Sequence, residues 1–148
     1  MTLKAWTVLV VCVAIATGVR AQVPSDEEGG LPRCVAVAKW SSDPIRGDDL
    51  WSAGGPGGAF VAVKTNAGHF ALLSLSALDT LVIESAQLFD ASGALLFEKE
   101  YLRIPGGSSF DVDTGKAAAD NTADVRWNTS GGKRLEPVNA AAIYRCQV

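Results

Sequence analysis

The amino-acid sequence predicts a mainly β fold, an antiparallel β-sandwich or small barrel, preceded by a cleaved signal peptide. After an apolar leader, roughly seven to nine short segments rich in apolar residues alternate with turns rich in glycine, proline, asparagine and aspartate, a spacing typical of these folds. Two cysteines, Cys34 and Cys146, lie near opposite ends of the chain that follows the leader. A chain of 148 residues is long enough to bury a core of its own.

Residues 1–21 have the layout of a secretory signal peptide. Lys4 precedes an apolar run over residues 5–19, and Val19 and Ala21 suit cleavage after residue 21. The run of about 15 residues is shorter than the roughly 20 that a transmembrane helix needs, which argues against an uncleaved anchor. We therefore expect a secreted or periplasmic protein with no membrane span after cleavage.

Residues 22–32 are acidic and contain glycine and proline, which predicts a flexible lead-in to a single β-rich domain over residues 33–148. The whole chain has a net charge of −3, and loss of Lys4 and Arg20 with the leader makes it more negative. This acidity argues against nucleic acid or an anionic membrane as the main partner. Because His69 is the single histidine and no Cys-x-x-Cys occurs, we predict no metal site and no cofactor.

The cysteine usage agrees with export. Cys12 lies in the leader, which leaves Cys34 and Cys146 with one possible intramolecular pairing. Such a bond would close almost the whole domain into one loop and would restrict the unfolded chain. A pair of free buried thiols is the alternative.

The first half of the domain predicts a strand, a long loop and a hairpin. Residues 34–40 alternate well enough for a strand. Residues 41–58 contain Asp-Pro, Gly-Asp and Gly-Gly pairs, which favour turns. Residues 59–65 and 69–75 predict two strands joined by a three-residue Asn-Ala-Gly connection.

Residues 76–90 are ambiguous between strand and helix. Their β-branched residues favour a strand over residues 80–89, whereas a capping-box pattern and an apolar stripe fit a helix. The Asp-Ala-Ser-Gly turn at residues 90–93 decides for the strand, because it leads into another alternating segment, 94–104, whose mixed faces indicate a sheet edge. The other expected strands and one expected loop follow: strands at 110–112, 123–127, 134–138 and 140–146, and a loop at 115–122.

The long loop is the predicted contact surface, because loops held by a rigid scaffold commonly carry recognition. Trp51 is a large apolar residue within this loop, and Asp48 and Asp49 lie close to it in sequence. We expect these three residues to contact a ligand, and we expect Trp40 and Trp127 to lie in the core.

Three short motifs match known catalytic, calcium-binding or recognition patterns. Residues 113–115 spell the Asp-Thr-Gly of aspartic proteases, but that chemistry needs two such carboxylates and the chain has one copy. Residues 111–115 hint at a calcium loop, although Asp120 and Asp124 do not fall at the spacing that would complete it. Residues 46–48 spell the integrin-recognised Arg-Gly-Asp in the long loop. Ordinary turn chemistry explains all three, and we assign no catalytic residue.

Other polar residues also have ordinary explanations. His69 begins a strand and is accompanied by no nucleophile motif. Glu98 and Glu100 fit a solvated strand face and lack the separate facing carboxylate of a glycosidase pair. Asn128 starts an Asn-Thr-Ser sequon, which would be glycosylated only in a eukaryotic secretory pathway.

The sequence therefore favours a small exported binding module, closed by one disulfide, over an enzyme, and its partner is expected to be a protein or a glycan. One alternative is a small extracytoplasmic hydrolase, which needs His69 close to Asp43, Asp48 or Asp111 in a cleft. Another is a structural component of the cell envelope that assembles through an exposed edge strand.

Overall fold

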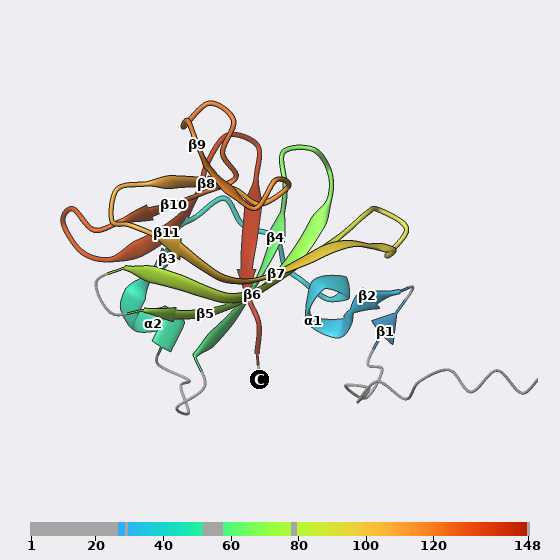
Figure 1. The fold of residues 1–148 in the computed structure, drawn as a ribbon. Coiled ribbons are helices and arrows are strands. Elements are labelled where there is room, and N and C mark those ends of the chain that lie inside the picture. The colour runs from blue at the N-terminus through green and yellow to red at the C-terminus, as the bar shows by residue number, and fades with distance from the viewer. Residues whose placement is uncertain (1–26, 29, 52–57, 78–79, 148) are drawn as a thin grey trace, which may run out of the picture.

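The computed structural model describes residues 27–28, 30–51, 58–77 and 80–147, and most of this chain is extended (Figure 1). The strands form two five-stranded antiparallel sheets and one two-stranded hairpin, so the predicted mainly β fold is confirmed. The predicted signal peptide and most of the predicted lead-in lie outside the described residues. No helix in the described part of the chain combines the length and apolar character that crossing a bilayer requires.

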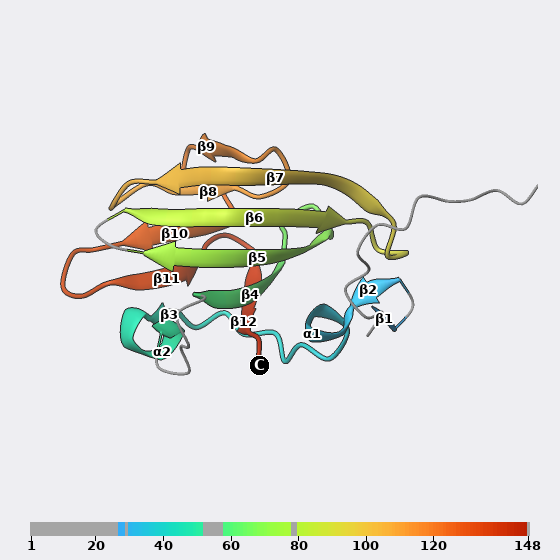
Figure 2. The same cartoon turned by 60° about the horizontal axis from the view of Figure 1, so that its bottom comes forward.

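One sheet contains the predicted hairpins, in the order β12-β4-β5-β6-β7, and Figure 2 shows β4 to β7 side by side. Gly68 closes the β4–β5 turn at a φ of 81°, and Gly93 closes the β6–β7 turn at 90°, conformations that glycine adopts readily. Residues 81–89 are a strand, which resolves the ambiguity in favour of the expected structure. The strands are β4 (Ala59–Lys64), β5 (Phe70–Ala77), β6 (Leu81–Phe89), β7 (Leu95–Ile104) and β12 (Ala142–Arg145).

The second sheet has the order β3-β11-β10-β8-β9. Strands appear within about two residues of the ranges expected for them near 110, 125 and 135. The loop expected over residues 115–122 is partly wrong, because Lys116–Ala118 pairs with β8. This segment of small and polar residues carries no alternation, so its pairing is imposed by the neighbouring strand. The strands are β3 (Ile45–Arg46), β8 (Ser109–Asp111), β9 (Lys116–Ala118), β10 (Val125–Asn128) and β11 (Arg134–Pro137).

The two sheets share one hydrophobic core, which fits the predicted β-sandwich. Leu73 and Ile83 of the first sheet and Trp127 and Leu135 of the second are completely buried in the same cluster. Burying each large apolar side chain stabilises the fold by roughly 1.5–3 kcal/mol. Trp127 therefore lies in the core, as expected.

Residues 34–40 are not the predicted strand. Arg33–Ala36 form the short helix α1, and residues 38–40 have no regular structure. Pro32, with a φ of −53°, precedes the helix and has the dihedral that a helix start needs. Val35 is the one buried residue of α1, where it packs with Ala62 and Cys146. In α1 the side chain of Val35 alone makes this contact. A strand over residues 34–40 would have to bury every second side chain along one face.

The predicted disulfide is present. Cys34 of α1 and Cys146 after β12 are bonded, with their Cα atoms 5.5 Å apart. Before α1, β1 (Glu27–Glu28) and β2 (Leu31–Pro32) pair as a hairpin within the predicted lead-in. Trp40, the other tryptophan expected in the core, is half-buried beside this region, with its ring centroid 5.8 Å from that of Phe70.

The predicted loop over residues 41–58 contains two regular elements. Ile45–Arg46 form β3, which pairs with β11, and Gly47–Trp51 form the short helix α2. Leu50 of α2 is completely buried in the main core and anchors the helix to the sandwich. Residues 52–57 of the predicted loop lie outside the described residues.

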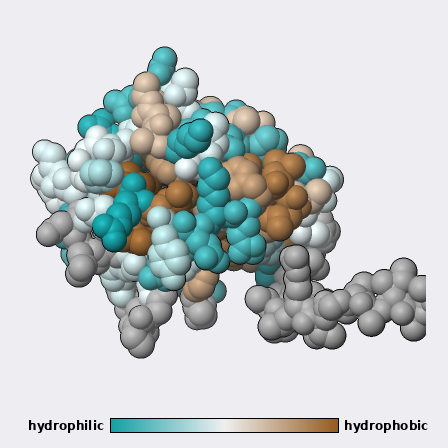
Figure 3. All heavy atoms as spheres, in the orientation of Figure 1, coloured by the Kyte–Doolittle hydropathy of each residue, from teal (hydrophilic) through white to brown (hydrophobic). Residues whose placement is uncertain are grey.

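β7 is the outer strand of its sheet, as its mixed pattern predicted, and within the described residues it pairs with β6 alone. Leu95 and Leu96 are about half exposed, and Figure 3 shows a hydrophobic area over the β6–β7 hairpin. Glu98 and Glu100 are exposed along the strand, and Tyr101 has a φ of 56°, a left-handed conformation that interrupts a regular edge. Charges and irregular backbone of this kind oppose edge-to-edge pairing.

Candidate functional site

A groove of about 690 Å³ lies between two segments that are far apart in the sequence. One wall comes from the end of β3 and from α2, and the other comes from the turn that joins β10 to β11. The groove therefore depends on the contact between these two segments. Its lining residues are Arg46, Gly47, Asp48, Trp51, Gly131, Gly132, Lys133 and Arg134.

A close backbone approach at Gly47 holds the two walls together. The amide of Gly47 donates a hydrogen bond to the carbonyl oxygen of Lys133 over 2.7 Å. A Cβ atom on Gly47 would lie 3.1 Å from that oxygen and 3.2 Å from the Cβ of Lys133, closer than ordinary van der Waals contact. Glycine at position 47 is therefore what lets α2 begin directly against the β10–β11 turn.

The β10–β11 turn is shaped by local hydrogen bonds and by two glycines. The side-chain oxygen of Asn128 accepts a hydrogen bond from the amide of Ser130 over 2.9 Å. Gly131 and Gly132 follow with φ values of 71° and 115°, which most other residues rarely adopt. Arg134 donates from Nη1 to the carbonyl oxygen of Ser130 over 3.1 Å and closes the turn.

The groove is electropositive although the protein is acidic. Its lining includes the cationic side chains of Arg46, Lys133 and Arg134 and the single carboxylate of Asp48, whereas the whole chain has a net charge of −3. Arg46 and Arg134 are directly opposite each other in the β3–β11 pair. Directly opposite residues of an antiparallel pair project from the same face of the sheet, so the side chains of Arg46 and Arg134 leave the backbone next to each other.

The carboxylate of Glu136 offsets the charge of Arg134, whose Nε lies 2.5 Å from Oε1 of Glu136. Among the described residues, Arg46 makes no comparable ion pair, and its side chain is exposed. Arg46 is therefore an exposed guanidinium of the lining, on the same wall as the carboxylate of Asp48.

Trp51 supplies an apolar wall. Its side chain is half-buried and packs against the main core, while part of it lines the groove. The end of α2 is fixed by Arg145, whose guanidinium donates to the carbonyl oxygen of Leu50 over 3.3 and 3.4 Å. The buried Leu50 and this contact anchor the end of α2, where Trp51 lies, to the sandwich.

Two of the three residues predicted to contact a ligand line this groove. Asp48 and Trp51 do so, and Asp49 is exposed on α2 without being part of the lining. The Arg-Gly-Asp tripeptide spans the end of β3 and the start of α2. Its Gly47 is buried, while Arg46 and Asp48 are exposed. The second wall was not among the residues predicted from the sequence, and the Gly131-Gly132 pair next to two basic residues is the signal that could have indicated it.

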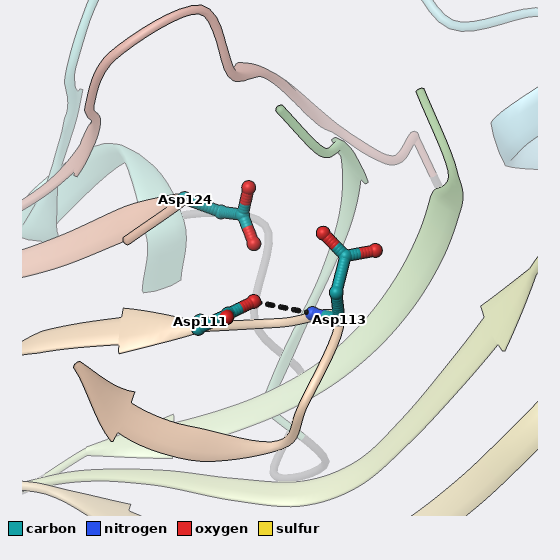
Figure 4. A group of neighbouring side chains, drawn as sticks. All are labelled: Asp111, Asp113 and Asp124. Atoms are coloured by element: carbon teal, nitrogen blue, oxygen red, sulfur yellow. Dashed lines mark hydrogen bonds between the residues drawn. The ribbon is translucent and has the colours of Figure 1, made fainter. Parts of the chain in front are cut away.

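A second cluster of polar residues lies at the other end of the sandwich. Asp111, Asp113 and Asp124 each offer a carboxylate oxygen, and these atoms lie within 4.8 Å of one another (Figure 4). Asp124 is completely buried and accepts hydrogen bonds from the amides of Asn66 and Val112, both over 2.8 Å. Calcium takes six to eight oxygens, and the cluster supplies three carboxylates toward that number.

Burial raises the pKa of Asp124 to about 6 from an ordinary value of 3.8. The two backbone hydrogen bonds oppose this rise, and the charges of Asp113 and Asp111 add to it. Through its two hydrogen bonds, the carboxylate of Asp124 connects Asn66 in the β4–β5 turn to Val112, the residue after β8.

His69 lies beside this cluster. Its Nδ1 is 2.8 Å from Oδ1 of Asp113, the same oxygen that accepts a hydrogen bond from the hydroxyl of Thr65 over 3.0 Å. The amide of His69 donates to the Thr65 hydroxyl oxygen over 3.1 Å. The direct partner of the His69 ring is therefore Asp113, and Asp111, one of the three aspartates that the hydrolase alternative named, belongs to the same cluster.

The contact between His69 and Asp113 joins the β4–β5 turn to the turn after β8. A histidine that activates a nucleophile needs a serine, threonine or cysteine within hydrogen-bond reach of its other ring nitrogen. Among the hydrogen bonds of the described residues, the His69 ring has Asp113 as its partner. Thr65 donates to the same Asp113 oxygen and accepts from the amide of His69. Thr65, His69 and Asp113 therefore form one hydrogen-bond network that connects the β4–β5 turn to the turn after β8.

The remaining site residues from the sequence lie apart from the groove lining. Glu98 and Glu100 are exposed on the edge strand β7. Asn128 is half-buried, and its Nδ2, the atom that carries a glycan in a glycosylated sequon, donates to Oε1 of Glu136 over 3.2 Å. Comparison of this chain with protein-family models, with curated proteins and with solved structures gave no match.

Proposed function

We propose that this chain is an exported binding module, closed by its disulfide, and that the groove between α2 and the β10–β11 turn is its contact surface. The observation that carries the proposal is the concentration of three cationic side chains and a tryptophan in one groove of an acidic protein. Tryptophan and arginine are the residue types that dominate binding energy at recognition surfaces. The partner is a protein or a glycan of the compartment to which the protein is exported.

Export is supported by two independent features. The first is the signal-peptide pattern of residues 1–21. The second is the disulfide between Cys34 and Cys146, because bonds of this kind persist in oxidising compartments and are rare in the cytosol. A secreted or periplasmic location fits both.

The two alternative functions have less support. For a hydrolase, the His69–Asp113 pair lies in a network in which Thr65 and His69 of the β4–β5 turn both contact Asp113. For assembly through an edge strand, β7 has the length, but Glu98, Glu100 and the left-handed Tyr101 oppose regular pairing along it.

The test is a chemical-shift map of the isotopically labelled, oxidised protein. The probes are the protein and glycan fractions of the compartment into which its host exports it. We expect one fraction to shift the amide signals of Gly131 and Gly132 and the indole signal of Trp51. The same fraction should leave the double variant Arg46→Glu/Trp51→Ala unchanged.

His69→Ala is the matched control, because His69 lies outside the groove lining and its substitution should leave the shifts in place. Shifts centred on His69 and Asp113, or along β7, would contradict the proposal. The first pattern would favour the hydrolase and the second would favour assembly through the edge strand.

A further inference from the structure

We infer that the groove binds an acidic saccharide, with a sugar carboxylate at the Arg46 side and the sugar ring against Trp51. This inference rests on the proposed function, because it names the ligand class of the same groove. It follows from the charge of the lining, from the shape of the two walls and from the strand edge that borders the groove.

The charge arrangement calls for an anion. Like charges directly opposite each other destabilise a strand pair, yet Arg46 and Arg134 occupy such positions. Glu136 pairs with Arg134, and the part of the chain that the structure describes shows no ion pair for Arg46. A carboxylate at the Arg46 side would offset the remaining charge, and the planar guanidinium group matches a carboxylate with two parallel hydrogen bonds. Lys133 lies on the adjoining wall.

The shape of the walls suits a ring. Trp51 presents an apolar surface of the kind that packs against the C–H groups of a sugar, and Gly131 and Gly132 bring no side chain into the opposite wall. Asp48 adds an acceptor for sugar hydroxyl groups. An apolar surface with a small number of placed polar groups is the usual design of a small-ligand site.

The bordering strand disfavours an extended peptide. Peptides that bind by strand addition need a free strand edge several residues long. The edge strand beside the groove is β3, which has two residues and runs directly into α2. Strand addition is therefore disfavoured here, and recognition through the side chains of the lining fits a sugar ring bearing a carboxylate.

The test uses isothermal titration of the full oxidised protein with four probes: trigalacturonate, a hyaluronan tetrasaccharide, neutral maltotriose and triglutamate. At least one of the two acidic saccharides should bind about tenfold or more tightly than maltotriose, since a hydrogen bond to a charged group contributes roughly that factor. It should also bind more tightly than triglutamate, whose carboxylates come with no sugar ring to pack against Trp51. Binding should weaken as salt is raised.

Variants separate the two halves of the site. Arg46→Ala should weaken the acidic saccharide about tenfold and leave maltotriose unchanged, and Arg46→Lys should recover part of the loss. Trp51→Phe should weaken every saccharide. Arg103→Ala, which removes an exposed arginine of β7, is the matched control and should leave all four affinities unchanged.

Equal binding of maltotriose, or tighter binding of triglutamate, would overturn the inference while leaving the groove as a contact surface. Absence of binding by both acidic saccharides at millimolar concentration would also overturn it. In that case the chemical-shift map with host fractions decides the proposed function by itself, because its readout does not depend on these probes.

Discussion

Loss of the bond between Cys34 and Cys146 should lower the free energy of unfolding by about 5 kcal/mol. The two cysteines are 112 positions apart, so the bond restricts almost the whole unfolded domain. For a loop of this length the chain-entropy relation gives about 16 cal/mol/K, or about 5 kcal/mol at 25 °C. Natural domains have a total stability of roughly 5–15 kcal/mol, so the reduced protein should lie close to its unfolding limit.

Urea denaturation followed by tryptophan fluorescence measures this difference, with the completely buried Trp127 as the main reporter. The oxidised protein, the reduced protein and Cys34→Ala/Cys146→Ala should be compared. Alanine is preferred to serine because Cys146 lies in an apolar cluster, where a hydroxyl group would be buried without a partner. The variant should match the reduced protein and be insensitive to reductant. A difference below about 1 kcal/mol between oxidised and reduced protein would refute the loop-restriction reasoning.

Three further predictions concern backbone and charge. Gly58→Ala should destabilise the protein by about 2 kcal/mol or more in a thermal melt, because its Cβ would collide with the carbonyl oxygen of Leu75; Gly107→Ala has a similar φ but open space around it and should lose less. The raised pKa of Asp124 means that its folded form binds a proton more tightly, so stability from this group is complete below pH 4 and is lost as the pH rises through 6. Relative to Asp124→Asn, the wild type should therefore gain up to about 3 kcal/mol in denaturation as the pH falls from 7 towards 4, and a gain in the opposite direction would contradict the burial argument. Tyr101→Gly should be neutral or stabilising by up to about 1 kcal/mol, because glycine relieves the left-handed backbone; a loss like that of an ordinary strand substitution would show that the conformation carries no strain.

The hairpins of the first sheet were predictable because their determinants are local. Gly68 and Gly93 sit where the chain must turn, and alternating residues flank each turn, so turn chemistry and strand pattern agree. The disulfide was equally accessible, since Cys34 and Cys146 had one possible intramolecular partner each in an exported chain.

The predictions from sequence were wrong where contacts with distant parts of the chain determine the secondary structure. Residues 34–40 alternate like a strand, but the contact of Val35 with Ala62 and the bond of Cys34 need a compact turn of helix. Two-residue and three-residue strands such as β3 and β9 are too short to have a pattern of their own. Their pairing depends on strands that lie many residues further along or back in the chain.

The candidate site was half predictable for the same reason. Trp51 stood out as a large apolar residue in a glycine-rich loop, which is a local signal. The opposite wall, with Lys133 and Arg134, comes from a different part of the chain. Its closeness to α2 depends on the hydrogen bond between Gly47 and Lys133, a long-range contact that no local pattern encodes.

The two edges of the first sheet differ, and this difference bears on how copies of the chain could join through that sheet. The β12 edge is occupied at Ile143, which exchanges backbone hydrogen bonds of 3.1 and 2.9 Å with Ser41. A fibre grows only when each molecule has two free sides, one for each neighbour. Each molecule has one β7 edge, so pairing of β7 with β7 joins two molecules and does not by itself continue into a fibre.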